Sequence, residues 1–372
     1  MRCVILSDLH IHSWAAFGQL NQDGINKRLA HSLDCLQQVF DIAVALKVEC
    51  VLFCGDLFHV RKIDVEVYDL AYRKFDDFSK SGIPFLAIPG NHDQALKNLS
   101  LNSIRPFSKV LHIMDEPLKI GNSRIHGIEY QRNKKDLIEK MKAAPASDLL
   151  MIHSGIAGAA ASAFYIAPEE ENLTLEEINQ FKEKFGIIIA GHFHNPHYLK
   201  INESGAAAKW RFPTGVKFDV KQGDVIIPGS PMQHNFGDSG MPRGCWVLDT
   251  SKWKAEFIKL DLPQFVSVDA SELAQKVDKL ANNYVLLKIP DSINQKHVDD
   301  LSRELSEICL GFSIERYATI AKESKRIEVS PGQSFGEMLG NFVDVKAPTD
   351  LDKDRLKKIG LEIMRENEVL KT

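Results

Sequence analysis

Five short apolar segments of the chain each stop at polar side chains of metal-binding type, and this pattern constrains the fold most. The segments and the residues that follow them are 4–6 with Asp8 and His10, 51–54 with Asp56, 85–88 with Asn91 and His92, 149–152 with His153, and 187–190 with His192 and His194. A continuous apolar run is typical of a strand buried on both faces of a sheet. Such strands would deliver these polar side chains to one edge of the fold.

Amphipathic helices are predicted between the early strands. Within residues 25–46 and 64–80, apolar side chains recur every three or four positions. Strands alternating with helices predict parallel crossovers, with helices covering a sheet. Segments 224–227, 245–248 and 255–260 alternate and predict a second, largely antiparallel sheet. We therefore predict an α/β fold in which two sheets and their flanking helices form an αββα sandwich.

Four regions are predicted along the chain. Residues 1–261 would form the sandwich, and residues 262–320 a smaller α/β domain in which strands and helices alternate. Residues 321–348 are predicted to be a linker, because the stretch 321–334 is polar and contains Pro331-Gly332. Residues 349–372 would form a charged helical tail with a modest apolar face.

Composition narrows the class of protein. Of 372 residues, 44% are hydrophobic and 26% are charged, which is typical of a globular chain. The formal net charge of -4 excludes a wholly basic nucleic-acid binder, so any contact with a polyanion must be local. The six cysteines show no zinc-ligand spacing, and no apolar run reaches the about 20 residues that span a bilayer. We expect an intracellular chain with reduced thiols and no membrane contact.

The polar residues at the strand ends predict a dinuclear metal site. Extended backbone would project Asp8 and His10 to one side, and likewise the pair His192 and His194. Carboxylate and imidazole ligands without thiolate favour manganese, iron or zinc over calcium. A natural partition gives one ion Asp8, His10, Asp56 and His194, and the other ion Asp56, Asn91, His153 and His192. Asp56 would bridge the two ions.

The charge of such a site points to phosphate chemistry. Two divalent ions bring four positive charges, whereas only Asp8 and Asp56 are anionic ligands, so about two positive charges remain. Two ions about 3.5–4 Å apart activate a water and stabilise the charge that develops on phosphorus. The predicted reaction is hydrolysis of a phosphoester. His92 is placed to stabilise or protonate the leaving oxygen, and His59 to orient it.

Several neighbouring residues have weaker support. His12, His197 and His234 do not follow a buried strand in the same way, although His12 would be able to line the pocket. Asp93 is predicted to support its loop rather than to bind metal.

In these residues, the chain resembles the calcineurin-like metallophosphoesterases. The resemblance rests on Asp8-x-His10, Gly55-Asp56, Gly90-Asn91-His92, His153 and Gly191-His192-x-His194. Within that superfamily the chain is most similar to the SbcD-type recombination nucleases. Asp56-Leu57-Phe58-His59 has their form rather than the Asp-Arg-Gly of protein phosphatases, and Gly90-Asn91-His92-Asp93, residues 227–231 and Phe236-Gly237 also fit. His12 departs from the family, which usually has glycine there.

The resemblance implies a complete set of site residues. The implied metal ligands are Asp8, His10, Asp56, Asn91, His153, His192 and His194, and the implied catalytic histidines are His92 and His59. Mn²⁺ would be the working metal at both positions.

The resemblance also implies a function and partners. It implies exonuclease and endonuclease action on DNA in recombination and double-strand-break repair, together with an SMC-like coiled-coil ATPase of the SbcC type. The chain would form a homodimer within a heterotetramer, with 262–320 as a DNA-capping domain and 349–372 as an ATPase-docking segment. Its brevity resembles bacteriophage forms of the nuclease subunit. The expected location is the cytoplasm of a bacterium or of a phage-infected host.

Two other functions are open to the same residues. A phosphodiesterase or phosphatase acting on small molecules would use the same metal site, but it would not need a separate domain beyond residue 262. A non-enzymatic scaffold would be expected to lack ligands, and none is missing. Local positive charge that would contact DNA phosphates, or equally form a solvated face, comes from Arg132, Lys134, Lys135, Lys209, Arg211 and Lys217.

Overall fold

The computed structural model describes most of the chain as two compact units. The described residues are 1–96, 98, 100–157, 159–162, 165–166, 172–201, 207–211, 217–318, 335–346 and 351–366. The first unit comprises Met1–Ile289 and Gln295–Glu315, and the second comprises Pro290–Asn294 and Arg316–Thr372. None of the described helices is both long and apolar enough to cross a lipid bilayer.

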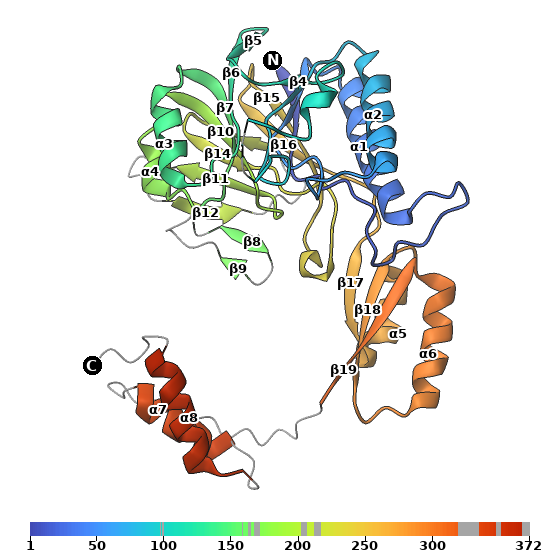
Figure 1. The fold of residues 1–372 in the computed structure, drawn as a ribbon. Coiled ribbons are helices and arrows are strands. Elements are labelled where there is room, and N and C mark those ends of the chain that lie inside the picture. The colour runs from blue at the N-terminus through green and yellow to red at the C-terminus, as the bar shows by residue number, and fades with distance from the viewer. Residues whose placement is uncertain are drawn as a thin grey trace. The chain divides into compact units, whose positions relative to one another are not determined.

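Two seven-stranded sheets form the body of the first unit (Figure 1). In spatial order, the first sheet contains β13 (Lys217–Asp219), β16 (Lys254–Lys259), β15 (Gly244–Asp249), β1 (Arg2–Leu6), β2 (Cys50–Phe53), β3 (Phe85–Ala87) and β4 (His112–Ile113). The second contains β12 (Ala207–Arg211), β11 (His197–Ile201), β14 (Asp224–Ile227), β10 (Phe185–Gly191), β7 (Ser147–His153), β6 (Ser123–Ile128) and β5 (Leu118–Ile120). Strands β1 to β4 are parallel, as are β6, β7, β10 and β14.

Helices cover the outer face of each sheet. Helices α1 (Lys27–Ala45) and α2 (Val65–Ser79) pack on the first sheet, whereas α3 (Lys134–Ala143) and α4 (Leu175–Asn179) pack on the second (Figure 1). Side chains alternate along β1, so that Val4 and Leu6 face the helices while Ile5 faces the other sheet. The central strands are therefore buried on both faces, which is why they are continuously apolar. This arrangement confirms the predicted α/β sandwich.

The predicted second antiparallel sheet is wrong in its membership. Strand β14 joins the second sheet in parallel with β10, whereas β15 and β16 form a hairpin that extends the first sheet antiparallel to β1. Alternation along a strand reports which side chains are buried, but it does not identify the strand that pairs with it. The three segments were therefore assigned to one sheet although they belong to two.

Short elements complete the sandwich. A capping box opens α4, since the Thr174 hydroxyl accepts from the Glu177 amide and the Glu177 carboxylate accepts from the Thr174 amide. The Asn26 side chain caps α1 by accepting from the amides of Arg28 and Leu29. The remaining short elements are the 3₁₀ turns Arg105–Phe107 and Phe236–Asp238 and the strand pair β8 (Ala160–Ser162) and β9 (Tyr165–Ile166).

A three-stranded sheet follows the sandwich. It contains β17 (Phe265–Asp269), β18 (Tyr284–Pro290) and β19 (Gly311–Tyr317), together with α5 (Leu273–Lys276) between two 3₁₀ turns and with α6 (Gln295–Ile308). The alternation of strands and helices matches the predicted order. The predicted boundary at residue 262 does not divide compact units, because most of this small sheet lies within the first one. Its role as a DNA-capping domain stays a prediction.

Two helices end the described chain. Helix α7 (Phe335–Lys346) lies inside the segment predicted as a linker, so that prediction is wrong for these residues, whereas 321–334 lie outside the described chain. Met338, Leu339 and Phe342 have helical spacing, which the polar stretch before them obscured. Helix α8 (Lys353–Glu366) forms the expected helical tail, and Lys357 pairs with Asp344 of α7 at 2.7 Å. A Cβ on Gly360 would lie 2.7 Å from Leu339 Cδ2, so glycine permits this close approach.

Candidate metal centre

The strand-end residues meet at one edge of the two sheets. Donor atoms of Asp8, His10 and His194 lie within 4.8 Å of one another, and so do donor atoms of Asp56, His153 and His192. Each group combines residues that follow strands of the first sheet with residues that follow or end strands of the second. The facing sheets therefore bring together ligands that are far apart in sequence. Each group is part of one of the two ligand sets predicted from the sequence.

The backbone places these ligands in a way that the sequence did not predict. Asp8, His10, Asp56 and His192 have positive φ angles of 54°, 48°, 62° and 102°. The expected extended backbone is therefore wrong for both the Asp8–His10 and the His192–His194 pair. Each such residue costs about 1–3 kcal/mol and persists only where other contacts hold it. Here the Asp8 amide donates to the Gly55 carbonyl at 2.9 Å, which ties the first loop to the second.

Asp56 lies between the two groups. One oxygen, Oδ2, lies 3.7 Å from His10 Nε2 and 3.4 Å from His153 Nε2. The other, Oδ1, accepts the His92 amide at 2.8 Å. A single buried carboxylate thus faces one imidazole of each group, which is the position a bridging ligand requires.

Asn91 completes the second group. Its side-chain oxygen lies 3.0 Å from His153 Nε2 and 3.1 Å from His192 Nδ1. In the first group, His10 Nε2 lies 3.2 Å from His194 Nε2. Two ligands about 2.1 Å from one ion are separated by about 3.0–3.4 Å, depending on the coordination angle. These spacings match the edges of a metal coordination shell.

The buried Asp8 carboxylate requires a compensating positive charge. Asp8 is fully buried, and its Oδ1 has no hydrogen-bond partner among the described residues. Burial is the main reason that the pKa of Asp8 is raised. A buried carboxylate oxygen without a partner is costly unless a cation compensates it. The residues present therefore fit two divalent ions.

Asp56 and His153 form a charged pair when metal is absent. Burial would lower the pKa of His153, but the Asp56 carboxylate more than offsets this and raises it to about 9. Burial would raise the pKa of Asp56, yet His153, His10 and His92 hold it below its usual range. His153 Nδ1 faces the Cys54 carbonyl at 2.7 Å, so this nitrogen is the donor and Nε2 is left for metal.

Metal binding is therefore expected to release a proton from His153. At pH 7 the imidazole of the metal-free protein is protonated, because its pKa of about 9 lies above this pH. A histidine must be neutral to bind a metal ion, so the affinity for Mn²⁺ should increase as the pH rises towards about 9 and change less above it. Calorimetric titration with Mn²⁺ in buffers of different ionisation enthalpy should report at least one proton released at pH 7 and fewer at pH 10. Equal release at both pH values would contradict this pairing.

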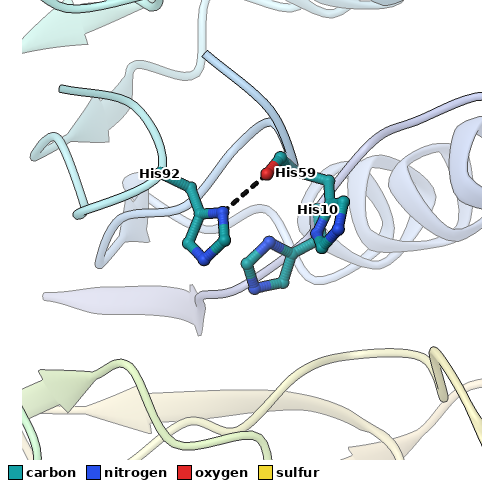
Figure 2. A group of neighbouring side chains, drawn as sticks. All are labelled: His10, His59 and His92. Carbon is teal, nitrogen blue, oxygen red and sulfur yellow. Dashed lines mark hydrogen bonds between the residues drawn. The ribbon is translucent and has the colours of Figure 1, made fainter. Parts of the chain in front are cut away.

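Two histidines flank the first group. Figure 2 shows His59 and His92 beside His10, with the His92 Nδ1 bonded to the His59 carbonyl at 2.6 Å. This bond makes Nδ1 the protonated nitrogen, so Nε2 is the nitrogen that exchanges protons. The His92 and His10 rings are 4.8 Å apart. Burial, and then His92, lower the pKa of His59 to about 4, which keeps its ring neutral at pH 7.

The structure adds residues to the centre that the sequence supported weakly or not at all. Buried His234 lies 5.2 Å from the His10 ring and bonds the Ser230 hydroxyl at 2.7 Å. Trp14 packs on His59 with ring centroids 4.2 Å apart. The ring centroids of His12 and His59 are 5.4 Å apart, so His12 lies beside the candidate metal centre. In the sequence, His234 had weak support because it does not follow a buried strand as the candidate ligands do, and no pattern indicated Trp14.

The predicted DNA contacts divide into three kinds. Lys134 pairs with Glu177 and Lys217 with Glu256 at 3.2 and 3.5 Å, so neither is a free cation. Arg132 is exposed and lines a cavity of 330 Å³, together with Tyr130 and the candidate ligand His192. Lys135 is exposed on α3, whereas the side chains of Lys209 and Arg211 lie outside the described structure.

The chain matches the calcineurin-like phosphoesterase family over residues 1–198. It belongs to this family. The matched span covers all five motifs and ends just beyond His194, so it contains every candidate ligand. Membership in the calcineurin-like phosphoesterase family implies a dinuclear divalent metal site, for which the two groups of Asp and His side chains are the candidates.

Relatives of known name include archaeal and phage proteins. "DNA double-strand break repair protein Mre11" of Sulfurisphaera tokodaii is 26% identical over 45% of this chain and 44% of its own length. "Exonuclease subunit 1" of Enterobacteria phage T4 is 24% identical over 87% of this chain and 89% of its own. The chain therefore spans about half the length of the first of these relatives. A metallophosphoesterase from Sphaerobacter thermophilus is a similar solved structure, with a TM-score of 0.34, 16% identity, and coverage of 75% of this chain and 94% of that one.

Proposed function

We propose that this chain is a dinuclear-metal-dependent DNA nuclease with exonuclease and endonuclease activity. The observation that carries the proposal is Asp56, whose Oδ2 lies 3.4 Å from His153 Nε2 and 3.7 Å from His10 Nε2, with His92 beside it. Two divalent ions held there would activate a water for attack on phosphorus and stabilise the charge that develops. The water oxygen forms a bond to phosphorus while the bond to the leaving oxygen breaks.

Particular residues would carry the proton steps. His92 donates through Nδ1 to the His59 carbonyl, which leaves Nε2 available, and in its imidazolium form His92 would give the Nε2 proton to the leaving oxygen and become neutral. His59, neutral at pH 7, would orient that oxygen. Asp8, His10, Asp56 and His194 would hold one ion, and Asp56, Asn91, His153 and His192 the other. Mn²⁺ is the proposed metal.

DNA is the proposed substrate because of the relatives and the surface beside the centre. The phage relative, which spans most of both chains, is named as an exonuclease subunit, and the archaeal relatives as double-strand-break repair proteins. Exposed Arg132 near His192 supplies positive charge for phosphates that flank the cleavage point. We further propose an SMC-like ATPase partner, a homodimer within a heterotetramer, a capping role for the small sheet, and action in the cytoplasm.

Digestion of DNA by the wild type and by His92→Ala tests the proposal. End-labelled duplex and single-stranded DNA are incubated with Mn²⁺ beside bis(p-nitrophenyl) phosphate. Wild type should degrade DNA, and His92→Ala should lose about 10²–10⁴-fold in kcat, because it removes a general acid. Metal content should stay at two ions per chain. Removal of metal by a chelator should abolish both reactions.

The outcome also separates the alternatives. The exposed His112 on β4 provides a matched control, and His112→Ala should keep wild-type activity. Cleavage of the small ester without cleavage of DNA would leave a phosphodiesterase that acts on small molecules, and the proposed partners would fall. Loss of activity together with loss of metal would assign His92 to metal binding rather than to proton transfer.

A further inference from the structure

Within the described part of the chain, Arg28 is a buried cation without an anionic partner. Its side chain is 1% exposed, and no carboxylate pairs with it among the residues that the structure describes. Its Nη2 donates to the His234 carbonyl at 2.8 Å, and Nη1 donates weakly to the Ala16 carbonyl at 3.4 Å. Burying a charge is costly, so such a residue persists only where other groups compensate it.

Three aromatic rings supply that compensation. The Arg28 Cζ lies 5.2 Å from the Trp14 ring centroid, 4.7 Å from Phe265 and 5.3 Å from Tyr284. A cation placed over an aromatic face is attracted by the ring quadrupole, and the attraction is stronger when the cation is desolvated. The rings come from two places, because Trp14 belongs to the loop after β1 whereas Phe265 and Tyr284 begin strands β17 and β18. Arg28 therefore joins the small sheet to the loop that carries Asp8 and His10.

On the side of the metal centre, Arg28 contacts two residues that reach the histidines. Trp14 packs on His59 at 4.2 Å between ring centroids, with an interplanar angle of 38°. The His234 main chain accepts from Arg28, while its ring lies 5.2 Å from His10 and its Nε2 lies 3.2 Å from the Asp8 carbonyl oxygen. Trp14 therefore contacts the predicted catalytic residue His59, and His234 contacts the predicted metal ligands His10 and Asp8.

On the side of the small sheet, the contacts are equally specific. The Phe265 and Tyr284 rings stack with centroids 5.0 Å apart. The Tyr284 hydroxyl bonds His31 Nδ1 of α1 at 3.0 Å, and the Phe265 amide donates to Gln233 Oε1 at 2.6 Å. Gln233 precedes His234 in the chain, so the same strand that carries Phe265 also holds the segment that carries His234.

We propose that Arg28 and Trp14 are positioning residues of the hydrolysis proposed above, and that they hold His59 and His234 at a place set by strands β17 and β18. The inference rests on that proposed function. Neither residue touches the reacting atoms. Arg28 fixes the Trp14 ring, the ring fixes His59, and the small sheet thereby contributes to turnover even for a substrate too small to reach it.

A double-mutant cycle at Trp14 and His59 tests the inference. The variants are Trp14→Leu, His59→Asn and both together, assayed with Mn²⁺ and bis(p-nitrophenyl) phosphate, with metal content and thermal midpoint measured for each. Trp14→Leu should lower kcat about 10-fold with KM unchanged and two ions bound, within the range that misplacement of a catalytic group allows. In the His59→Asn background the same change should lower kcat less than about twofold, because neighbours that act as one unit are not additive.

Further variants test Arg28 and one of the rings that contact it, Tyr284. Arg28→Met should reproduce the loss seen in Trp14→Leu, and Arg28→Lys should recover part of it by keeping a cation above the rings. Tyr284→Leu should also lower kcat, since it removes one of the three rings. The matched control is Trp253→Leu in the turn between β15 and β16, which should keep wild-type kcat. Where Arg28→Met fails to fold, the Trp14–His59 cycle still decides the question.

Different results would contradict the positioning role and the proposed function. Equal effects of Trp14→Leu in both backgrounds, an unchanged kcat in Trp14→Leu, or a wild-type kcat in His59→Asn would each overturn the inference. A change confined to the thermal midpoint would show a purely structural role and overturn it as well. A wild-type protein that hydrolyses neither the small ester nor DNA would overturn the proposed function itself, whereas an active wild type with unaffected variants overturns only the positioning role.

Discussion

Replacing Asp56 by asparagine should lower hydrolysis of a phosphodiester by about 10³-fold or more, equivalent to about 4 kcal/mol of lost transition-state stabilisation. Asp56 is 2% exposed, and its Oδ2 faces His10 of one group and His153 of the other. An amide has only one oxygen and no charge, so it cannot bridge two ions and neutralise part of their repulsion. We expect the protein to retain at most one ion per chain.

Metal content, kcat and the thermal midpoint together check this result. The amide oxygen introduced by Asp56→Asn should still accept the His92 amide that Asp56 Oδ1 accepts at 2.8 Å, so the loop should stay in place. The midpoint of the metal-free protein should nevertheless fall at pH 7, because buried His153 loses the carboxylate that pairs with it. Asp278, exposed on the turn after α5, provides a matched control, and Asp278→Asn should behave like wild type. A variant that binds two ions and keeps a tenth of wild-type activity would exclude Asp56 as the bridge.

The second large effect is expected at Asp93, which joins the two loops that carry the candidate ligands Asp56 and Asn91. Its Oδ2 accepts the amides of Asp56 and Gly90 at 2.8 and 2.9 Å, and its Oδ1 accepts those of Leu57 and Phe58 at 3.1 and 3.3 Å. The residue is 1% exposed. These bonds confirm that Asp93 supports its loop. They also hold the positive φ angle of Asp56, because the Asp56 amide is one of the four donors.

Asp93→Asn should destabilise the fold by about 2–4 kcal/mol, since the new NH₂ group faces buried amide donors and leaves one or two of them unpaired. Affinity for Mn²⁺ should fall about 10–100-fold, as expected when a group that orients ligands is lost. The thermal midpoint with and without Mn²⁺, and a Mn²⁺ titration, measure both effects. Asp278→Asn again serves as control. An unchanged midpoint together with unchanged affinity would mean that the loops keep their place without these bonds.

Much of the metal centre was predictable because its signals are local. Each ligand follows a short apolar run, and the residue types themselves define the chemistry of the site. The interpretation of Asp56 as a bridge rested on residue type, because an aspartate has two oxygens with which it can bridge two ions. The sandwich was predictable for a similar reason, because central strands must be apolar on both faces.

Other features depended on contacts between distant residues. The hairpin β15–β16 pairs with β1, which precedes it by more than 200 positions, so no local pattern indicated that partner. The left-handed conformations of Asp8 and Asp56 arise because their loops bond to each other and to Asp93. Arg28 reads as an ordinary helical residue in sequence, yet it lies buried among Trp14, Phe265 and Tyr284.

By itself, the sequence indicated the candidate ligands, the edge of the fold at which they lie, and the family to which the chain belongs. Only the tertiary structure decided which strands share a sheet, how Asp56 comes to face both groups, and which side chain packs on His59. The physical reason is that the spacing of apolar residues and the chemistry of side chains are properties of neighbouring residues in the sequence. Strand pairing and side-chain packing depend instead on which distant parts of the chain come into contact.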